Sequence, residues 1–135
     1  MGTLAGFLKE NRKQIKTEKY VASPQFIDED GKPLEWDIQT ITCKKDEAVR
    51  KESTKQTKNG TEFDYDKYTL KLCVACITSP NLNAVELQNS YGVMGAEELL
   101  SEMLLPGELH RLKIKVQEVN GYTETMNDLV EEAKN

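Results

Sequence analysis

The chain has 135 residues and a formal net charge of −5, with 38% apolar and 30% charged residues. This size and balance predict one globular domain, residues 1–135, that needs no disulfide to stabilise it. There is no apolar run long enough to span a bilayer, no signal-peptide pattern and only an odd number of cysteines, so we expect a cytoplasmic protein that does not bind membranes.

Charge is distributed unevenly along the chain. Residues 1–71 are close to neutral, whereas residues 72–110 contain five acidic residues and no Lys or Arg. A surface of this kind repels phosphate backbones. We therefore expect no nucleic-acid partner.

The N-terminal segment, residues 1–19, combines an apolar pattern with a basic run. Leu4, Phe7 and Leu8 stand at helical spacing and predict a short helix that docks on the rest of the domain. The lysine-rich run that continues to residue 19 predicts a mobile connector.

Residues 20–41 predict a β-hairpin. Two stretches of extended character flank the turn-forming sequence DEDGKP. In the second stretch apolar and polar residues alternate, which places Leu34, Trp36 and Ile38 on the face that meets the core. An isolated hairpin is only marginally stable, so we expect this one to pack on helices.

Residues 42–135 predict a helical region. Thr42 is suited to cap a helix that runs to about residue 55, and Asp64 or Asp66 opens an apolar helix that Pro80 stops. Shorter helices follow: an Asn83-capped helix at 84–90, then 96–105, 106–119 and a last helix opened by Thr125. The predicted fold class is α+β, mainly α, with the N-terminal β-hairpin packed on about five to six short helices.

The stretch ELQNSYGVMGAEELL, residues 86–100, breaks two leucine-bearing helical patterns with two glycines. Gly92 is suited to the left-handed position that ends the first helix. Gly95 then caps the second helix, with Glu98 reaching back to the cap and Met94 packing on the new helix. This pattern predicts a joint between helices and no catalytic residue.

The spacing Cys73-x-x-Cys76 is that of half a zinc site or a redox pair. A closed zinc site needs two more ligands, and only Cys43 and His110, distant in sequence, are available. Because Cys in an apolar helix packs as a small hydrophobe, we favour a core role and keep a thiol or zinc-binding protein as the alternative function. One histidine, with no nucleophile elbow or phosphate loop, predicts no enzyme and no cofactor.

Three segments carry a family resemblance. They read FIDEDGKPLEWDIQTIT (Phe26–Thr42), PNLNAVELQNSYGVMGAEELLSEMLLPGEL (Pro80–Leu109), and VQEVNGY (Val116–Tyr122) through DLVEEAKN (Asp128–Asn135). Together they resemble the XkdN-like family of phage tail assembly chaperones, in order from about Leu4 to the C-terminus.

The resemblance implies a non-enzymatic chaperone of a phage or prophage. Such chaperones are thought to bind the long, helical tape measure protein before tail-tube subunits polymerise around it. The tape measure protein is therefore the expected partner, with the tail tube protein as a second candidate. The resemblance also implies the host cytoplasm, absence from the mature virion, and a programmed minus-one frameshift at Ala133-Lys134-Asn135.

Client binding requires an apolar groove with a polar rim. We predict that Leu100, Leu104 and Ile114 bind the partner, because they fall beside the apolar stripes of their helices and are expected to stay partly exposed. Alternatively, these three residues complete a self-contained core or a contact between two copies, which leaves self-association open. The acidic segment 72–110 is expected to steer a lysine-rich client.

Overall fold

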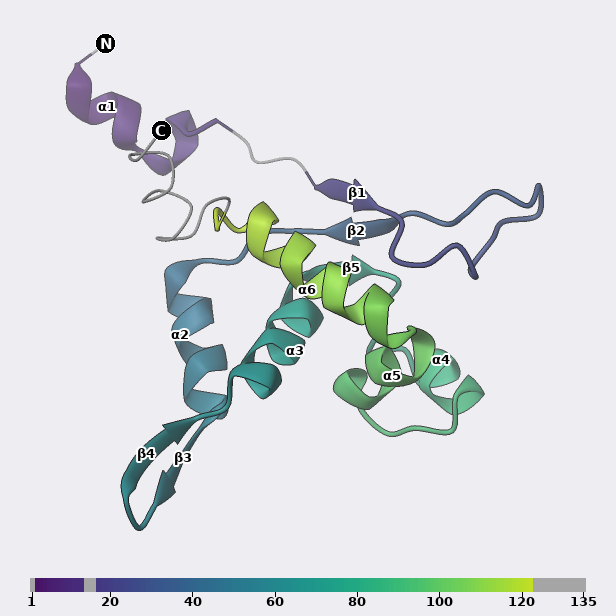
Figure 1. Ribbon diagram of the computed structural model, residues 1–135. Helices are drawn as coiled ribbons and strands as arrows, with labels where there is room; N and C mark the ends of the chain where they lie inside the picture. The colour runs from purple at the N-terminus through teal and green to yellow at the C-terminus, as the bar shows by residue number, and fades with distance from the viewer. Residues whose placement is uncertain (1, 14–16, 123–135) are drawn as a thin grey trace, which may run out of the picture.

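The computed structural model describes residues 2–13 and 17–122 and shows an α+β fold that is mainly helical (Figure 1). The predicted fold class is confirmed. The elements in chain order are α1 (Thr3–Phe7), the 3-10 helix η1 (Lys9–Asn11), β1 (Glu18–Tyr20), β2 (Trp36–Ile38), α2 (Cys43–Glu52), β3 (Thr54–Thr57), β4 (Gly60–Phe63), α3 (Tyr65–Cys76), β5 (Ile77–Ser79), α4 (Val85–Ser90), α5 (Ala96–Met103) and α6 (Pro106–Val119). The helix predicted to open at Thr125 lies outside the described residues.

An antiparallel sheet in the order β1-β2-β5 forms one side of the core. In β1 and β2, Tyr20 stands opposite Trp36 and Glu18 opposite Ile38. Trp36 and Ile38 are both buried, as the alternating pattern predicts. The prediction is wrong for Leu34, which lies before β2 in the loop and is exposed. The predicted hairpin is thus present and packs on helices.

The first strand of this hairpin is shorter and earlier than the predicted stretch 20–27. Residues 21–35 form a long loop, and an isolated bridge between Ile27 and Pro33 closes its tip. Pro24 lies in this loop and lacks the N–H that a strand ladder needs. The loop therefore turns away from the sheet and returns to it at Trp36.

The third strand differs from the expectation of a helix that reaches Ile77. Helix α3 ends at Cys76, and Ile77–Ser79 pairs antiparallel with β2. Residues that precede a proline avoid the helical region, and β-branched residues favour strands, so this short segment is extended. The central helix therefore runs directly into the sheet.

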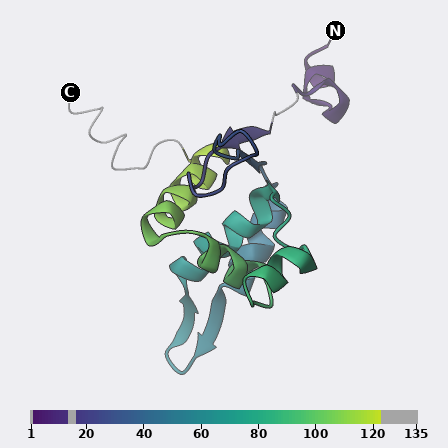
Figure 2. The same ribbon diagram turned by 90° about the vertical axis from the view of Figure 1, so that its right-hand side faces the viewer.

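Helix α3 lies at the centre of the molecule, where it contacts α2, α5 and α6 (Figures 1 and 2). The predicted caps of α2 and α3 are both present: the Thr42 side chain accepts from the Lys45 N–H at the start of α2, and the Asp64 side chain accepts from the Lys67 N–H at the start of α3. Its fully buried side chains include Leu72, Cys73 and Cys76. The two cysteines are thus part of the hydrophobic core.

A second hairpin, β3–β4, stands where a helix to about residue 55 was expected. Helix α2 ends at Glu52, and β3 and β4 pair in register, with Thr57 opposite Gly60. Gly60 has a φ of 114°, a conformation that side-chain-bearing residues rarely adopt. Thr54 and Thr57 favour a strand, and the Asn59-Gly60 dipeptide favours the turn.

The joint between α4 and α5 follows most of the expected pattern. Gly92 has a φ of 67°, and the Val93 N–H donates to the Gln88 carbonyl, which together form the predicted left-handed helix end. Gly95 is the cap residue of α5, as predicted.

Three details of this joint are corrected. Ala84, not Asn83, is the cap of α4. Glu98 does not reach back to Gly95, whose N–H instead donates to the Gln88 side chain at 3.0 Å. Met94 is almost fully exposed and does not pack on α5.

The predicted N-terminal helix is present as α1, which spans Thr3–Phe7. Its docking on the domain is not observed, because none of its residues is buried and Leu4 and Phe7 are strongly exposed. Part of the expected connector, residues 14–16, lies outside the described chain.

Candidate partner-binding surface

An apolar hollow lies between the loop after β1, the ends of β2 and β5, and helices α4 and α5. We call it the aromatic groove. Its apolar lining residues are Phe26, Leu34, Trp36, Pro80, Leu87, Tyr91 and Met103. Its volume of about 250 Å³ is below the roughly 300–1,000 Å³ of typical small-molecule sites, so it suits a few anchoring side chains of a protein partner.

The aromatic groove is supported from beneath by the sheet. Trp36 is buried, and the Phe26 ring packs against it with 6.2 Å between the ring centroids. A hydrogen bond of 2.7 Å from the Leu34 N–H to the Phe26 carbonyl fixes the two sides of the loop. The groove wall is therefore built into the fold, although it lies in a loop.

The surroundings of the aromatic groove are acidic. Glu35 is part of its lining, and the loop tip carries three acids, Asp28, Glu29 and Asp30, against one base, Lys32. The helical wall comes from residues 72–110, which lack Lys and Arg. The groove thus pairs an apolar floor with a negative rim.

A second hollow, the α3–α6 groove, lies between the first half of α3 and the length of α6. It has a volume of about 370 Å³. Its lining includes Tyr65, Thr69, Leu109, His110 and Ile114. The Tyr65 hydroxyl donates to Gln117 across it at 3.4 Å, and its charged residues, Asp66 and Lys113, are of both signs.

The predicted exposure of the three partner-binding residues is confirmed for one of them and wrong for two. Ile114 is 45% exposed in the α3–α6 groove. Leu100 and Leu104 are buried: α5 packs on α3, and Leu99, Leu100, Met103 and Leu104 all belong to the hydrophobic core. In the described residues, Leu100 and Leu104 complete the core, as the alternative interpretation held.

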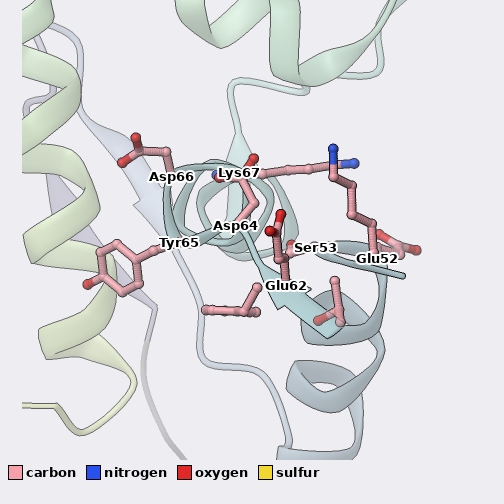
Figure 3. Close-up of a pocket in the computed structure, with 10 residues that line it drawn as sticks. Glu52, Ser53, Glu62, Asp64, Tyr65, Asp66 and Lys67 are labelled. Carbon is pink, nitrogen blue, oxygen red and sulfur yellow. The ribbon is translucent and has the colours of Figure 1, made fainter. Parts of the chain in front are cut away.

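A third hollow, of about 540 Å³, opens at the base of the β3–β4 hairpin (Figure 3). Glu52 comes from the end of α2, Glu62 from β4, and Lys67 from the first turn of α3. Tyr65 and Asp66 point away from Glu52 and Ser53 (Figure 3). The Asp64 side chain is engaged in capping α3, so the polar side chains of this open hollow do not converge on a common point.

The residues of the thiol or zinc alternative are not assembled into a site. Burial raises the pKa of Cys73 to about 12 and also raises the pKa of Cys76. Cys43 is exposed at the start of α2, and His110 lines the α3–α6 groove. Within residues 2–13 and 17–122 there is no group of three or more His, Cys, Asp or Glu side chains able to hold a metal ion.

Sequence reasoning missed Phe26, Pro80 and Tyr91 as groove residues. Leu34 and Trp36 are expected from their alternation, but only as core residues. The available signal is that Phe26 and Tyr91 are aromatic residues beside turns, where a ring tends to stay partly accessible. The groove arises when β5 brings Pro80 next to Trp36, which the sequence does not reveal.

Comparison with known proteins assigns the chain to a family. The family model of the phage XkdN-like tail assembly chaperone proteins matches residues 4–134, so this chain belongs to that family. The protein is 26% identical over 131 residues to the phage-like element PBSX protein XkdN of Bacillus subtilis (strain 168), covering 91% of this chain and 88% of the relative.

A second relative and a solved structure are also similar to this chain. The chain is 29% identical over 119 residues to the uncharacterized protein YqbN of Bacillus subtilis (strain 168), covering 84% of this chain and 80% of YqbN. The crystal structure of the protein YqbN superposes with a TM-score of 0.79 at 21% identity, over 90% of this chain and 98% of that one, which shows a shared fold. Among the described helices, none is long and apolar enough to cross a membrane.

Proposed function

We propose that this tail assembly chaperone binds the tape measure protein as a helical client in the aromatic groove. The observation that carries the proposal is the combination of an apolar groove with a bordering segment, residues 72–110, that contains acids and no Lys or Arg. An amphipathic helix binds by laying its apolar face in such a groove. Lysines on the flanks of the client helix then meet the acidic rim.

The proposal gives the chaperone a physical task. A long amphipathic client exposes an apolar face that associates with other copies before the tail tube surrounds it. Covering part of that face in the groove removes apolar surface from water, while the negative chaperone surface keeps the complex soluble. The tail tube protein is a second candidate partner.

On the same proposal, the protein acts in the host cytoplasm and is absent from the mature virion. A longer form arises by a minus-one frameshift at Ala133-Lys134-Asn135, which lies outside the described residues. Sequencing the coding DNA tests the frameshift directly: an AAG codon for Lys134, or a closed minus-one frame, contradicts it.

Ile114 provides a second, separable contact in this proposal. It is exposed in the α3–α6 groove, on a different side of α6 from the buried Leu112 and Val116. Leu100 and Leu104 are buried, so they contact a client only if α5 moves. Their partner-binding role stays a prediction that depends on such a movement.

Three apolar residues of matched exposure make the experiment sharp. Leu34 in the aromatic groove is 45% exposed, Ile114 in the α3–α6 groove 45%, and Phe63 on β4 44%. Each is changed to Glu, and each variant is co-expressed with the tape measure protein of the same phage or prophage. Size-exclusion chromatography then measures co-elution and the soluble fraction of the client.

We expect wild type and Phe63→Glu to co-elute with the client and keep it soluble. Leu34→Glu is expected to lose the complex, because it places a charge in the apolar floor of the groove. Ile114→Glu is expected to weaken the complex less. Equal binding by all three variants, or loss with Ile114→Glu alone, overturns the aromatic groove as the client site.

A further inference from the structure

The N-terminal segment presents an apolar surface that its own short helix cannot stabilise. Helix α1 has five residues, whereas isolated helices shorter than about 12–15 residues are marginal in water. Leu4 is 77% and Phe7 81% exposed, and Leu8 is also exposed. Packing on another apolar surface stabilises such a segment, so α1 is suited to dock.

The segment also carries charge opposite to that of the aromatic groove. Lys9, Arg12 and Lys13 follow the apolar residues directly, with Glu10 as the one acid among residues 2–13. The groove has an apolar floor, Glu35 in its lining and a helical wall without Lys or Arg. Apolar and charged complementarity therefore coincide, and they favour association as well as register.

The attachment of the segment favours docking on another copy. The segment is anchored at β1, in which Glu18 stands opposite Ile38 of β2. The Glu18 side chain also forms an ion pair with Lys115 of α6, at 3.2 Å. The groove begins at Trp36, opposite Tyr20, at the other end of the same strand pair. Figure 1 shows α1 beyond the start of β1, on the side away from α4.

We propose that the N-terminal segment, residues 2–13, docks through Leu4, Phe7 and Leu8 into the aromatic groove of a second copy of this chain. Two copies that exchange segments in this way form a closed, two-fold symmetric dimer in which both grooves are filled. Burial of Phe7 supplies the main apolar contact, and the basic residues after it lie along the acidic rim.

This dimer has a regulatory consequence that rests on the proposed function. If the client takes the same groove, the segment of the second copy must leave first, so the dimer is the resting form and the client converts it to a complex with free N-terminal segments. Segment and client then compete for one surface. The groove of a free chaperone is thereby kept from unrelated apolar partners.

Disulfide trapping in the full chain tests the docking without any client. Cys43 is first replaced by Ser, since Cys73 and Cys76 are buried. Chains with Gly6→Cys, which keeps Leu4, Phe7 and Leu8 and adds a side chain where nothing lies within 4 Å, are mixed with chains with Leu34→Cys and oxidised. The matched control mixes Gly6→Cys with Phe63→Cys. We expect the first pair to form disulfide dimers at least about tenfold faster, because docking raises the local thiol concentration.

The alternatives give distinct results. A single chain that carries both Gly6→Cys and Leu34→Cys forms dimers if the segment is exchanged, and closes on itself as a monomer if it folds back. That closure, or equal rates for the Leu34 and Phe63 partners, overturns the proposal. So does a wild-type protein that stays monomeric by light scattering at all concentrations.

Light scattering adds an independent readout. Phe7→Glu is expected to shift the dimer to monomer, whereas Met94→Glu, a change at an exposed residue outside the groove lining, is expected to leave it unchanged. High salt weakens the dimer by screening its basic contacts. No client is present in these experiments. A negative result therefore disproves the dimer without deciding whether the client binds in the aromatic groove.

Discussion

The two antiparallel sheets of this protein use their side chains in opposite ways. The β1-β2-β5 sheet buries Trp36 and Ile38 against the helices, whereas no residue of β4 is buried and β3 has only half-buried ends. The first sheet is part of the core and builds the aromatic groove. The second is a projecting hairpin that is held mainly at its base (Figure 1).

The base of the β3–β4 hairpin is a small aromatic and charged cluster. The rings of Phe63 and Tyr68 lie 5.4 Å apart, and the Arg50 guanidinium lies 4.4 Å from the centre of the Tyr68 ring. Asp46 accepts hydrogen bonds from both Arg50 and Tyr68. The first sheet therefore stabilises the whole domain, whereas the second is itself held in place by contacts with side chains of α2 and α3.

Replacing Trp36 by Ala tests this difference with the largest expected effect. Loss of a buried Trp costs about 3–5 kcal/mol of unfolding free energy, so the variant is expected to unfold partly or fully. Urea unfolding followed by far-UV circular dichroism measures the change, because Trp36 is the only tryptophan and its fluorescence is lost.

Phe63→Ala on the second sheet is the matched comparison. It removes one tilted aromatic pair from a half-exposed ring, so its cost is expected at about 1 kcal/mol. Equal losses for Trp36→Ala and Phe63→Ala would show that the β3–β4 hairpin is as integral to the domain as the first sheet.

The junction between the hairpin and the central helix gives an effect of similar size. Asp64 caps α3 through the Lys67 N–H at 3.0 Å, and its own N–H donates to the Ser53 carbonyl at 2.8 Å. Asp64→Ala is expected to lower the unfolding free energy by about 1 kcal/mol, whereas Asp64→Ser retains a capping oxygen. Thermal unfolding of both variants checks this; a full loss with Asp64→Ser argues against capping as the cause.

Burial patterns account for what the sequence predicts well. The alternation around Trp36 indicates a strand, and the apolar stretch that ends α3 indicates a buried helix, because apolar side chains must leave water. The caps Thr42 and Asp64 and the glycine Gly92 follow from local hydrogen bonding, which the sequence also encodes. These features explain why the fold class is predictable from the chain alone.

The remaining features depend on contacts between distant residues. The β3–β4 hairpin has no apolar face to reveal it, and β5 becomes a strand by pairing with β2 far along the chain. Burial of Leu100 and Leu104 follows from how tightly α5 is enclosed, which periodicity cannot measure. The sequence therefore predicts most of the elements that form the aromatic groove, but not the groove itself.

Acid is expected to weaken the connection between the first sheet and α6 through Glu108. The buried Glu108 carboxylate accepts from the Leu105 N–H at 2.8 Å and from Gln25, in the loop after β1, at 3.2 Å. The Leu105 hydrogen bond, which favours the charged form, lowers the pKa of Glu108 from 4.5.

The sign of the pH effect follows from this lowered pKa. The stabilisation is complete above pH 4.5, where the carboxylate is charged in both the folded and unfolded states, and it is lost as the pH falls toward the folded-state pKa. Glu108→Gln is therefore expected to destabilise at neutral pH and to approach wild type in acid. A constant difference across this range, measured by urea unfolding, contradicts the assignment.

Substitution of two glycines with open surroundings is expected to give the smallest and most local changes in stability. An added Cβ at Gly60 or Gly92 meets nothing within 4 Å, so the cost of Ala at either position is the strain of a positive φ, about 1 kcal/mol. At Gly60, in the hairpin turn, the strain is relieved by local opening, so global unfolding is expected to change by less than about 0.5 kcal/mol.

Hydrogen exchange distinguishes the two sites. In Gly60→Ala the amides of Thr54–Phe63 are expected to lose protection while those of α3 and α6 keep it. In Gly92→Ala the strain falls on the helix end that places Tyr91 in the aromatic groove, so the global unfolding free energy is expected to drop by about 1 kcal/mol and client binding to weaken. If Gly60→Ala instead lowered protection throughout α3, the hairpin would be coupled to the core, and the division between a structural sheet and a dependent one would fail.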